Sequence, residues 1–571
     1  MGRIRSVEAE AIEPHASGID RGEWLRVIGW SAVILIITSL PYLFGALISS
    51  PDAQFGGLVI GVEDGNSYLA KMRLGATGAW QFYLFYTTEP HQGAYLLLFH
   101  LLLGKVARLS GLSFILTYHL ARVVCGFFLL ASVYRFSAFF TDLRPVRRLT
   151  LWIVGIGGGL GWLVALLGLM DRVGLPLDFY SPEAFIFHAL LALPHLLLAE
   201  GLLLWAILLV LLAWESQKMR YAFLGGLALL GMTIVVAFYI FIAAVVVAIG
   251  WLLRRWQMRG EASRPWAEAG LAILAFAISA PVPLYNAYVF TTNPAFKVWA
   301  EQNHILSPSP IHFLLAFGPL ALLAVVGIWT DWRLGLTRNA WSGRRLLLIG
   351  WCVAVPLLVY IPFNLQRRLT LGVQVPLAIL AALGLWYIFV GSRQTGDAPE
   401  EARKPVTGDA LRRWRILSVG LVALMSLSNL VILLGAGLEV SRKSPPIFHS
   451  GVEVDAADWL GAHAAADDVV LAAYETSNFL PTRMSARVFA GHGPETIHSD
   501  AKRELQRQFF TDDPDDAFRR DLLSDYGVTY VFSGPAERAL GDFAPEDVPY
   551  LQQVYDNGGV QIYAVVSASH D

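Results

Sequence analysis

Cysteine and charge are both scarce in this sequence, and each scarcity excludes a class of protein. The only two cysteines, Cys125 and Cys352, lie inside apolar runs, so the chain has no disulfide framework. Charged residues make up 15% of the 571 residues, and 43 basic against 45 acidic side chains leave a net charge of −2. Because this balance produces no overall field for nucleic acid, we expect no nucleic-acid partner.

Apolar residues are abundant instead, at 55% of the chain, with a mean hydropathy of +0.52. Runs of about 20 apolar residues recur, and this length crosses the hydrocarbon core of a bilayer. The run 24–48 is too long for a cleaved signal and lacks its small-residue exit, which predicts a retained anchor. The sequence therefore predicts a polytopic α-helical membrane protein with about eleven membrane helices. The spans are expected near 24–48, 113–139, 149–170, 184–214, 221–253, 266–289, 310–330, 346–363, 369–391 and 416–438.

Basic residues between the spans predict the orientation, because short cytoplasmic loops are rich in Lys and Arg. Five such clusters are expected in the cytoplasm, within 144–148, 218–220, 254–264, 333–345 and 393–415. Residues 1–23 then form a cytoplasmic tail, and residues 439–571 form an α/β domain on the outer side of the cytoplasmic membrane. The outer loops are 49–112, 171–183, 290–309 and 364–368. For this topology, 95–108 must be an interfacial helix, and 221–253 must enter and return as two short helices.

An acidic pair, Glu63 and Asp64, stands in the first outer loop. A carboxylate beside the membrane can deprotonate an acceptor hydroxyl or amine, or hold a divalent cation such as Mg²⁺ or Mn²⁺ against a phosphate. The alternative is a solvated turn, for which Asp-Gly and Asn-Ser are ordinary material.

The order of segments in this half of the chain resembles that of the GT-C membrane glycosyltransferases. The segments are the first helix, the acidic loop, the short amphipathic helix, the stretch from Leu112 to Arg122 and a second acidic loop. The resemblance concerns architecture and implies a GT-C-like domain over 24–438. It implies that Asp64, with Glu63 beside it, is the first-loop catalytic acid, and that Asp178 or Glu183 is the second-loop acid. Neither loop contains Asp-x-Asp, so the resemblance leaves metal dependence open, with Asp64 and Asp178 as the candidate ligands.

Arg367 and Arg368 are candidates for binding a lipid phosphate, because a guanidinium matches phosphate oxygens in two-point geometry. The alternative is anchoring to lipid headgroups. His188 and His195 lie on one face of a predicted helix and are expected to line a cleft. The alternative for His195 is a hydrogen bond to a carbonyl freed by Pro194.

Loop 290–309 combines aromatic and hydrogen-bonding side chains, including Lys297, Asn303 and His304, as a sugar site does, although an aromatic belt has the same composition. In the C-terminal region, the stretch 491–498 has histidines, but its Gly-His-Gly-Pro start forbids the helix that a zinc site on this spacing needs. We expect this stretch to dock over the membrane cleft or to contact the acceptor.

The predicted function is transfer of a glycosyl group from a polyprenyl-phosphate-linked sugar to an acceptor at the outer membrane face. The partners would be membrane lipid, this donor and an acceptor that the sequence does not identify. Two alternatives remain: a transporter of lipid-linked sugars, which would favour repeated halves with broken helices, and an inactive relative that acts as a binding module.

Overall fold

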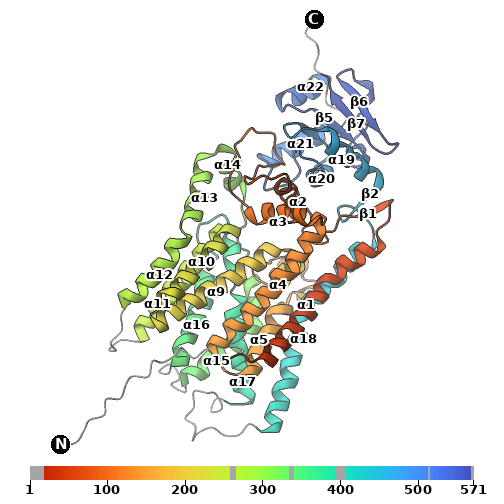
Figure 1. The fold of residues 1–571 in the computed structure, drawn as a ribbon. Coiled ribbons are helices and arrows are strands. Elements are labelled where there is room, and N and C mark those ends of the chain that lie inside the picture. Colours follow the sequence, from red (N-terminus) through yellow and green to blue (C-terminus); the bar gives the residue numbers. More distant parts are fainter. Residues whose placement is uncertain (1–17, 258–264, 334–339, 392–406, 512–514, 567–571) are drawn as a thin grey trace, which may run out of the picture.

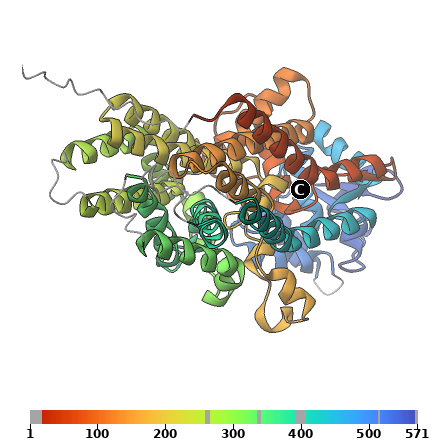
Figure 2. The ribbon, with the colours of Figure 1, turned by 90° about the horizontal axis from the view of Figure 1, so that it is seen from below.

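A bundle of long helices makes up most of the molecule (Figure 1). The computed structural model describes residues 18–257, 265–333, 340–391, 407–511 and 515–566. The longer helices are α1 (Arg21–Ile48), α4 (Phe114–Phe140), α9 (Pro194–Ser216), α10 (Met219–Val235), α11 (Ile240–Gln257), α15 (Pro310–Arg333), α16 (Ala340–Leu358), α17 (Gln374–Phe389) and α18 (Gly408–Ser441). Seen from below, the bundle is elongated, with the yellow-green helices gathered at one end (Figure 2).

Seven described helices are long and apolar enough to cross a membrane, and the number rises to eight if the bent pair α12 (Pro265–Ser279) and α13 (Pro281–Thr292) is one span. The protein is therefore a multi-pass membrane protein, although these counts are below the eleven helices expected. The predicted re-entrant segment 221–253 does form two helices, α10 and α11, separated at 237–239 by η2 (Ala237–Tyr239). However, the 21 residues from Ala237 to Gln257 meet the length of a full span, which the sequence analysis did not expect.

The predicted span 149–170 is broken. It forms α5 (Arg144–Ile156), α6 (Gly161–Leu166) and α7 (Met170–Val173), with a non-helical segment at the glycines 157–159. Asp178 stabilises this break, because one of its carboxylate oxygens accepts hydrogen bonds from the backbone of Gly159 and Gly161 and from the hydroxyl of Ser428, at 2.6–3.0 Å. Irregular backbone in a membrane bundle needs such internal partners.

The predicted span 184–214 is also broken, into α8 (Ile186–Ala192) and α9, at Pro194. Three side chains donate hydrogen bonds to the carbonyls before the proline: Arg122 to Leu190, Tyr42 to Leu191 and Tyr118 to Ala192, at 2.7–2.8 Å. His195 donates to none of them, so the alternative interpretation of His195 was wrong.

The end of the bundle that carries the C-terminal region is called here the capped end (Figure 1). Helices α2 (Val62–Ala76) and α3 (Leu98–Ser110) lie there, between the bundle and the C-terminal region. Helix α3 is the short helix expected over 95–108, and its position at a membrane surface stays a prediction. Predicted loop 290–309 is partly helical, because it contains α14 (Pro294–Gln302).

The C-terminal region contains a five-stranded sheet of order β4-β3-β5-β7-β6, in which β3 pairs parallel to β4 and β5 while β7 pairs antiparallel to β5 and β6. The strands are β3 (Val469–Leu471), β4 (Arg487–Val488), β5 (Tyr530–Ser533), β6 (Leu551–Asp556) and β7 (Gln561–Val565), and the helices are α19 (Gly451–His463), α20 (Tyr474–Phe479), α21 (Ser499–Phe509), α22 (Asp516–Asp525) and α23 (Pro535–Arg538). The region combines helices with a sheet, so the predicted α/β class is confirmed.

The C-terminal region is not a separate body attached by a linker. Strand β2 (Phe448–Ser450) pairs antiparallel with β1 (Ala53–Phe55) of the first outer loop. One hydrophobic cluster joins Phe82 and Tyr86 of that loop, Phe296 of α14 and Val470 of the sheet. The first outer loop therefore folds together with the C-terminal region, and α2 contacts α20 and the adjoining η7 (Leu480–Thr482) of that region.

Several basic side chains at the opposite end are paired with acids. Arg147 pairs with Glu23, Arg344 with Glu215, and Arg345 with Asp331, at 2.6–3.4 Å. The predicted cytoplasmic residues Arg259, Arg264, Arg338, Arg393, Arg403 and Lys404, and residues 1–17 of the predicted tail, lie outside the described residues.

Candidate active site

The acidic pair lies in the first turn of α2, not in the solvated turn that was the alternative. Helix α2 starts after Gly61, whose φ of 60° is a left-handed conformation that glycine adopts without strain. Glu63 and Asp64 then stand at the positive end of the helix dipole, where carboxylates are stabilised.

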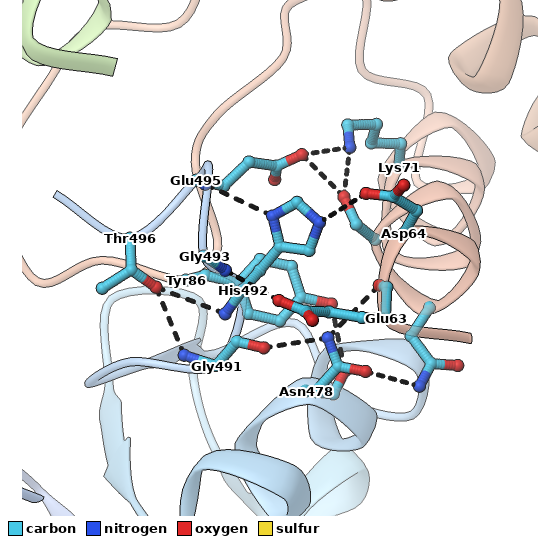
Figure 3. A network of polar contacts seen from close by, with 12 residues as sticks. Glu63, Asp64, Lys71, Tyr86, Asn478, Gly491, His492, Gly493, Glu495 and Thr496 are labelled. Atoms are coloured by element: carbon cyan, nitrogen blue, oxygen red, sulfur yellow. Dashed lines mark hydrogen bonds and ion pairs between the residues drawn. The ribbon is translucent and has the colours of Figure 1, made fainter. Parts of the chain in front are cut away.

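Asp64 reaches a histidine of the C-terminal region (Figure 3). Its Oδ1 lies 3.0 Å from Nε2 of His492, and the Asp64 side chain is 56% exposed while that of His492 is 4% exposed. The backbone N–H of Glu495 donates to Nδ1 of His492 at 3.2 Å, which places the imidazole proton on Nε2. His492 therefore donates to Asp64, and no other donor from the described part of the chain reaches this carboxylate.

Glu63, the neighbouring acid, has a different environment. Its Oε1 accepts hydrogen bonds from the hydroxyl of Tyr474 at 2.6 Å and from the backbone N–H of Gly493 at 2.8 Å. Asn478 donates to the Glu63 carbonyl at 3.2 Å. All three partners belong to the C-terminal region, so Glu63 holds that region on α2, whereas the Asp64 carboxylate has a single hydrogen-bond partner among the described residues, His492.

A buried ion pair supports the same contact (Figure 3). Lys71 of α2 lies 2.6 Å from Glu495, and their side chains are 1% and 5% exposed. Ser67 donates to the same oxygen of Glu495 at 2.7 Å and accepts a hydrogen bond from Lys71. Burial raises the pKa of Glu495, but the charge of Lys71, together with the hydrogen bonds from Lys71 and Ser67, holds that pKa below its usual value.

Charges around Asp64 keep it ionised. Partial burial raises the pKa of Asp64, but the hydrogen bond from His492, followed by the charges of Arg368 and Lys71, lowers it below the usual value. For His492, burial lowers the pKa, while the charges of Glu495 and Asp64 raise it above its usual value overall. Asp64 is thus a partly exposed anion surrounded by positive charge.

Arg368 links this acid to the second outer loop. Its Nε lies 3.5 Å from Oε1 of Glu183, whose side chain is 5% exposed, while the Arg368 side chain remains 34% exposed. The other second-loop candidate, Asp178, is fully buried at the break after α5 and does not join this group. The structure therefore brings Asp64, Arg368 and Glu183 into one electrostatic group.

The remaining basic and histidine candidates also differ in whether they lie near Asp64. Arg367 stacks its guanidinium 4.8 Å from the ring centroid of Tyr180. His188 is buried and donates to the carbonyl of Asp178 at 3.0 Å, a contact remote from the acidic pair. His195 meets the ring of Tyr68, one turn beyond Asp64 on α2, at 5.0 Å, so its ring lies close to the site.

The three candidates of loop 290–309 do not contact the acidic pair. Lys297 is 57% exposed and lies 3.9 Å from Glu301, Asn303 ends α14, and His304 is exposed. Their neighbour Gln302 is the residue of this segment that reaches the site region, because it donates to the carbonyls of Pro494 and Thr496 at 3.1 and 2.6 Å.

A metal ion does not fit the residues named from the sequence. Asp178 is fully buried and accepts hydrogen bonds from Gly159 and Ser428, whereas Asp64 is held by His492, so no contact joins the two acids as a ligand pair. Among the described residues, no group of three or more His, Cys, Asp and Glu side chains is arranged to hold a metal. Dependence on Mg²⁺ or Mn²⁺ stays a prediction.

Sequence reasoning missed Lys71, Ser67 and Tyr474, which stand in the contact between α2 and the C-terminal region. A lysine within a short helix carries no signal of a buried partner more than 400 residues away. The stretch 491–498 did carry a signal, and it contacts α2; the expected docking over a membrane cleft or contact with the acceptor stays a prediction.

No protein-family model matches the sequence, and no curated protein matches it. Solved structures do match the fold. The archaeal oligosaccharyltransferase AglB from Archaeoglobus fulgidus, in complex with an inhibitory peptide and a dolichol-phosphate, aligns with a TM-score of 0.54 and 12% identity over 95% of this chain and 75% of its own. Its apo form gives 0.54 over 97% and 76%.

The arabinofuranosyltransferase AftD from mycobacteria, in a mutant form, aligns with a TM-score of 0.56 and 18% identity over 97% of this chain. This chain spans 42% of the length of AftD. Because the alignments extend over nearly the whole chain, they include both the helical bundle and the C-terminal region. At these identities the likeness concerns the fold, and the chain has the fold of the GT-C membrane glycosyltransferases.

Proposed function

We propose that this protein transfers a glycosyl group from a polyprenyl-phosphate-linked sugar to an acceptor at the outer face of the cytoplasmic membrane. The observation that carries the proposal is the state of Asp64: a partly exposed carboxylate with a lowered pKa, held by His492 and acted on by the charge of Arg368. An acid and a basic group at the capped end of a membrane bundle suit an acceptor that loses a proton and a donor that leaves as a phosphate.

In the proposed reaction, Asp64 accepts the proton of the acceptor hydroxyl or amine through its free oxygen. The acceptor atom forms a bond to the anomeric carbon of the donor, and the bond from that carbon to the phosphate oxygen breaks. The polyprenyl phosphate leaves with the electron pair, and Arg368 compensates its developing charge. Glu183 keeps the Arg368 side chain directed toward this position through their ion pair.

The likeness to AglB supports a lipid phosphate as the donor, because that structure contains a dolichol-phosphate. It also supports an acceptor outside the bilayer, because the same structure contains an inhibitory peptide. In this chain, the acceptor would approach Asp64 from the C-terminal region and the donor would approach from the bundle, where Arg368 precedes α17. The sugar and the acceptor would be identified by assaying a panel of donors and acceptors.

Asp64→Asn keeps the size of the side chain but removes its charge and its capacity as a base, so transfer should fall about 10²–10⁴-fold. We would measure release of labelled sugar from a panel of short-chain polyprenyl-phosphate sugars, with envelope glycans and peptides as acceptors. Asp455→Asn on α19 is the matched control, because Asp455 is exposed and distant in sequence from the site. Wild-type activity in Asp64→Asn would refute the assignment.

The same assay separates the two alternatives. A transporter of lipid-linked sugars would move the donor across a bilayer without releasing sugar, and Asp64→Asn would not change sugar release. An inactive binding module would bind donor or acceptor with no turnover in the wild type. The likeness to two transferases favours transfer over both.

A further inference from the structure

We infer that His492 is a positioning residue for Asp64 and that the C-terminal region thereby completes the active site. This inference rests on the proposed function and deepens it. His492 would not touch the substrate: it would fix one oxygen of Asp64 so that the other is directed at the acceptor. The contact joins residues 428 positions apart in the chain, so only the docked C-terminal region supplies it.

The loop that carries His492 is held from two sides. Gln302 of α14 donates to the carbonyls of Pro494 and Thr496 and accepts from the N–H of His498 at 3.2 Å. From the first outer loop, Thr87 accepts from the N–H of Ile497 at 3.3 Å. A catalytic group is aligned only as well as the residues that hold it, and here the holding residue is itself fixed.

The loop also bonds to itself. The hydroxyl of Thr496 accepts from the N–H groups of Gly491 and His492, both at 3.3 Å, and the N–H of Thr496 donates to the carbonyl of His492 at 2.8 Å (Figure 3). These bonds close a tight turn around His492, from which the imidazole reaches Asp64 of α2 beside the contacts that Gly493 and Glu495 make with Glu63 and Lys71. The turn therefore presents Nε2 to Asp64 in a single orientation.

Asp64 needs such support because more than half of its side chain is exposed. An exposed carboxylate samples several rotamers, whereas a hydrogen bond from a buried imidazole selects one. The selection costs little at the moment of reaction, since His492 is already buried and its Nδ1 already accepts the Glu495 amide.

The test compares His492→Ala with His492→Gln in the full-length protein in nanodiscs. Alanine removes the donor, so kcat should fall about 10–100-fold, because misplacing a catalytic group has an effect of this size. The donor KM should stay within about twofold, since the lost contact acts on the reacting geometry rather than on binding. Glutamine keeps an N–H donor near the position of Nε2 and should recover most of kcat. His463→Ala on α19 is the control, because this histidine is exposed and stacks on Trp459.

A second measurement does not depend on turnover. Thermal unfolding of Asp64→Ala, His492→Ala and the double variant should be non-additive if the two side chains interact. Wild-type kcat in His492→Ala, equal losses in the alanine and glutamine variants, or additive unfolding shifts would each overturn the inference. If the wild type transfers no sugar from any donor, the proposed function fails together with it. If Asp64→Asn abolishes transfer and His492→Ala does not reduce it, only the inference fails.

Discussion

Glu63 and Asp64 are adjacent carboxylates in the same helical turn, yet their partners give them different tasks. Glu63 accepts two hydrogen bonds from the C-terminal region on one oxygen, whereas Asp64 accepts one bond, from His492. Asp178 and Glu183 differ in a similar way, since Asp178 accepts hydrogen bonds from the backbone of a broken helix and Glu183 pairs with Arg368. Residue type predicted all four acids as candidate site residues. Only their partners distinguish the acids at the site from those that stabilise the fold.

The arginine pair provides a prediction at this scale. Arg368→Gln should weaken donor binding about ten- to a hundredfold, because a hydrogen bond to a charged group is worth about 1.5–3 kcal/mol. Arg368→Lys should recover part of the loss, since an ammonium supplies the charge without the planar fork. Titration of a short-chain polyprenyl-phosphate sugar measures this affinity.

Arg367→Gln is the matched control, because it changes the same charge on the neighbouring residue, whose guanidinium stacks on Tyr180. Thermal unfolding should accompany both titrations, since removing Arg368 leaves the buried Glu183 without its ion pair. Equal donor affinity in wild type and Arg368→Gln would mean that the phosphate is bound elsewhere.

At the scale of elements, the position of the site depends on how closely α2 lies on α3. A Cβ added to Gly104 would stand 1.8 Å from the carbonyl oxygen of Met72, and one added to Gly75 would stand 2.0 Å from that of Leu101. The two backbones are therefore in contact, and only glycine fits at the crossing. This contact fixes the position of α2, and therefore where its first turn meets the C-terminal region.

Gly104→Ala should consequently separate α2 from α3. We expect a loss of about 1–3 kcal/mol in unfolding free energy, as for other overpacked sites, and lower transfer because Asp64 moves. Thermal unfolding and sugar release measure the two effects. Gly270→Ala on α12 is the control, because nothing lies within 4 Å of its added Cβ. Unchanged stability and activity in Gly104→Ala would show that α2 can shift without consequence.

At the scale of the whole molecule, the charged site and the C-terminal region occupy one end of the bundle, and many basic helix ends occupy the other. The positive-inside rule predicts that the basic end faces the cytoplasm. The acceptor would then meet Asp64 outside the cell, where no soluble nucleotide sugar is supplied, which agrees with a donor carried by a lipid.

This orientation is tested by labelling single cysteines in a background with Cys125 and Cys352 replaced by Ser. Ser524→Cys on α22 is exposed in the C-terminal region and should react with an impermeant maleimide in intact cells. Lys218→Cys, exposed between α9 and α10, should react only after the membrane is opened. Labelling in the opposite order would reverse the sidedness of the site and refute an outer acceptor.

The sequence by itself determined the membrane class, most helix positions, the α/β character of the C-terminal region and the acidic pair. These properties follow from local patterns: apolar length sets the spans, and period and composition set the strands and helices. It did not determine the breaks at 157–161 and Pro194, because a broken helix is stable only when distant side chains, here Asp178 and Tyr118, satisfy the freed backbone groups.

The tertiary structure alone decided the membership of the site. His492 and Glu495 meet Asp64 and Lys71 of α2 only after a chain of more than 400 residues has folded back on itself. Burial and proximity then change the chemistry of ordinary residues: a lysine of α2 becomes the buried partner of Glu495, and the pKa of Asp64 is lowered. Such effects depend on distances between residues that are remote in the sequence, and local sequence patterns do not give those distances.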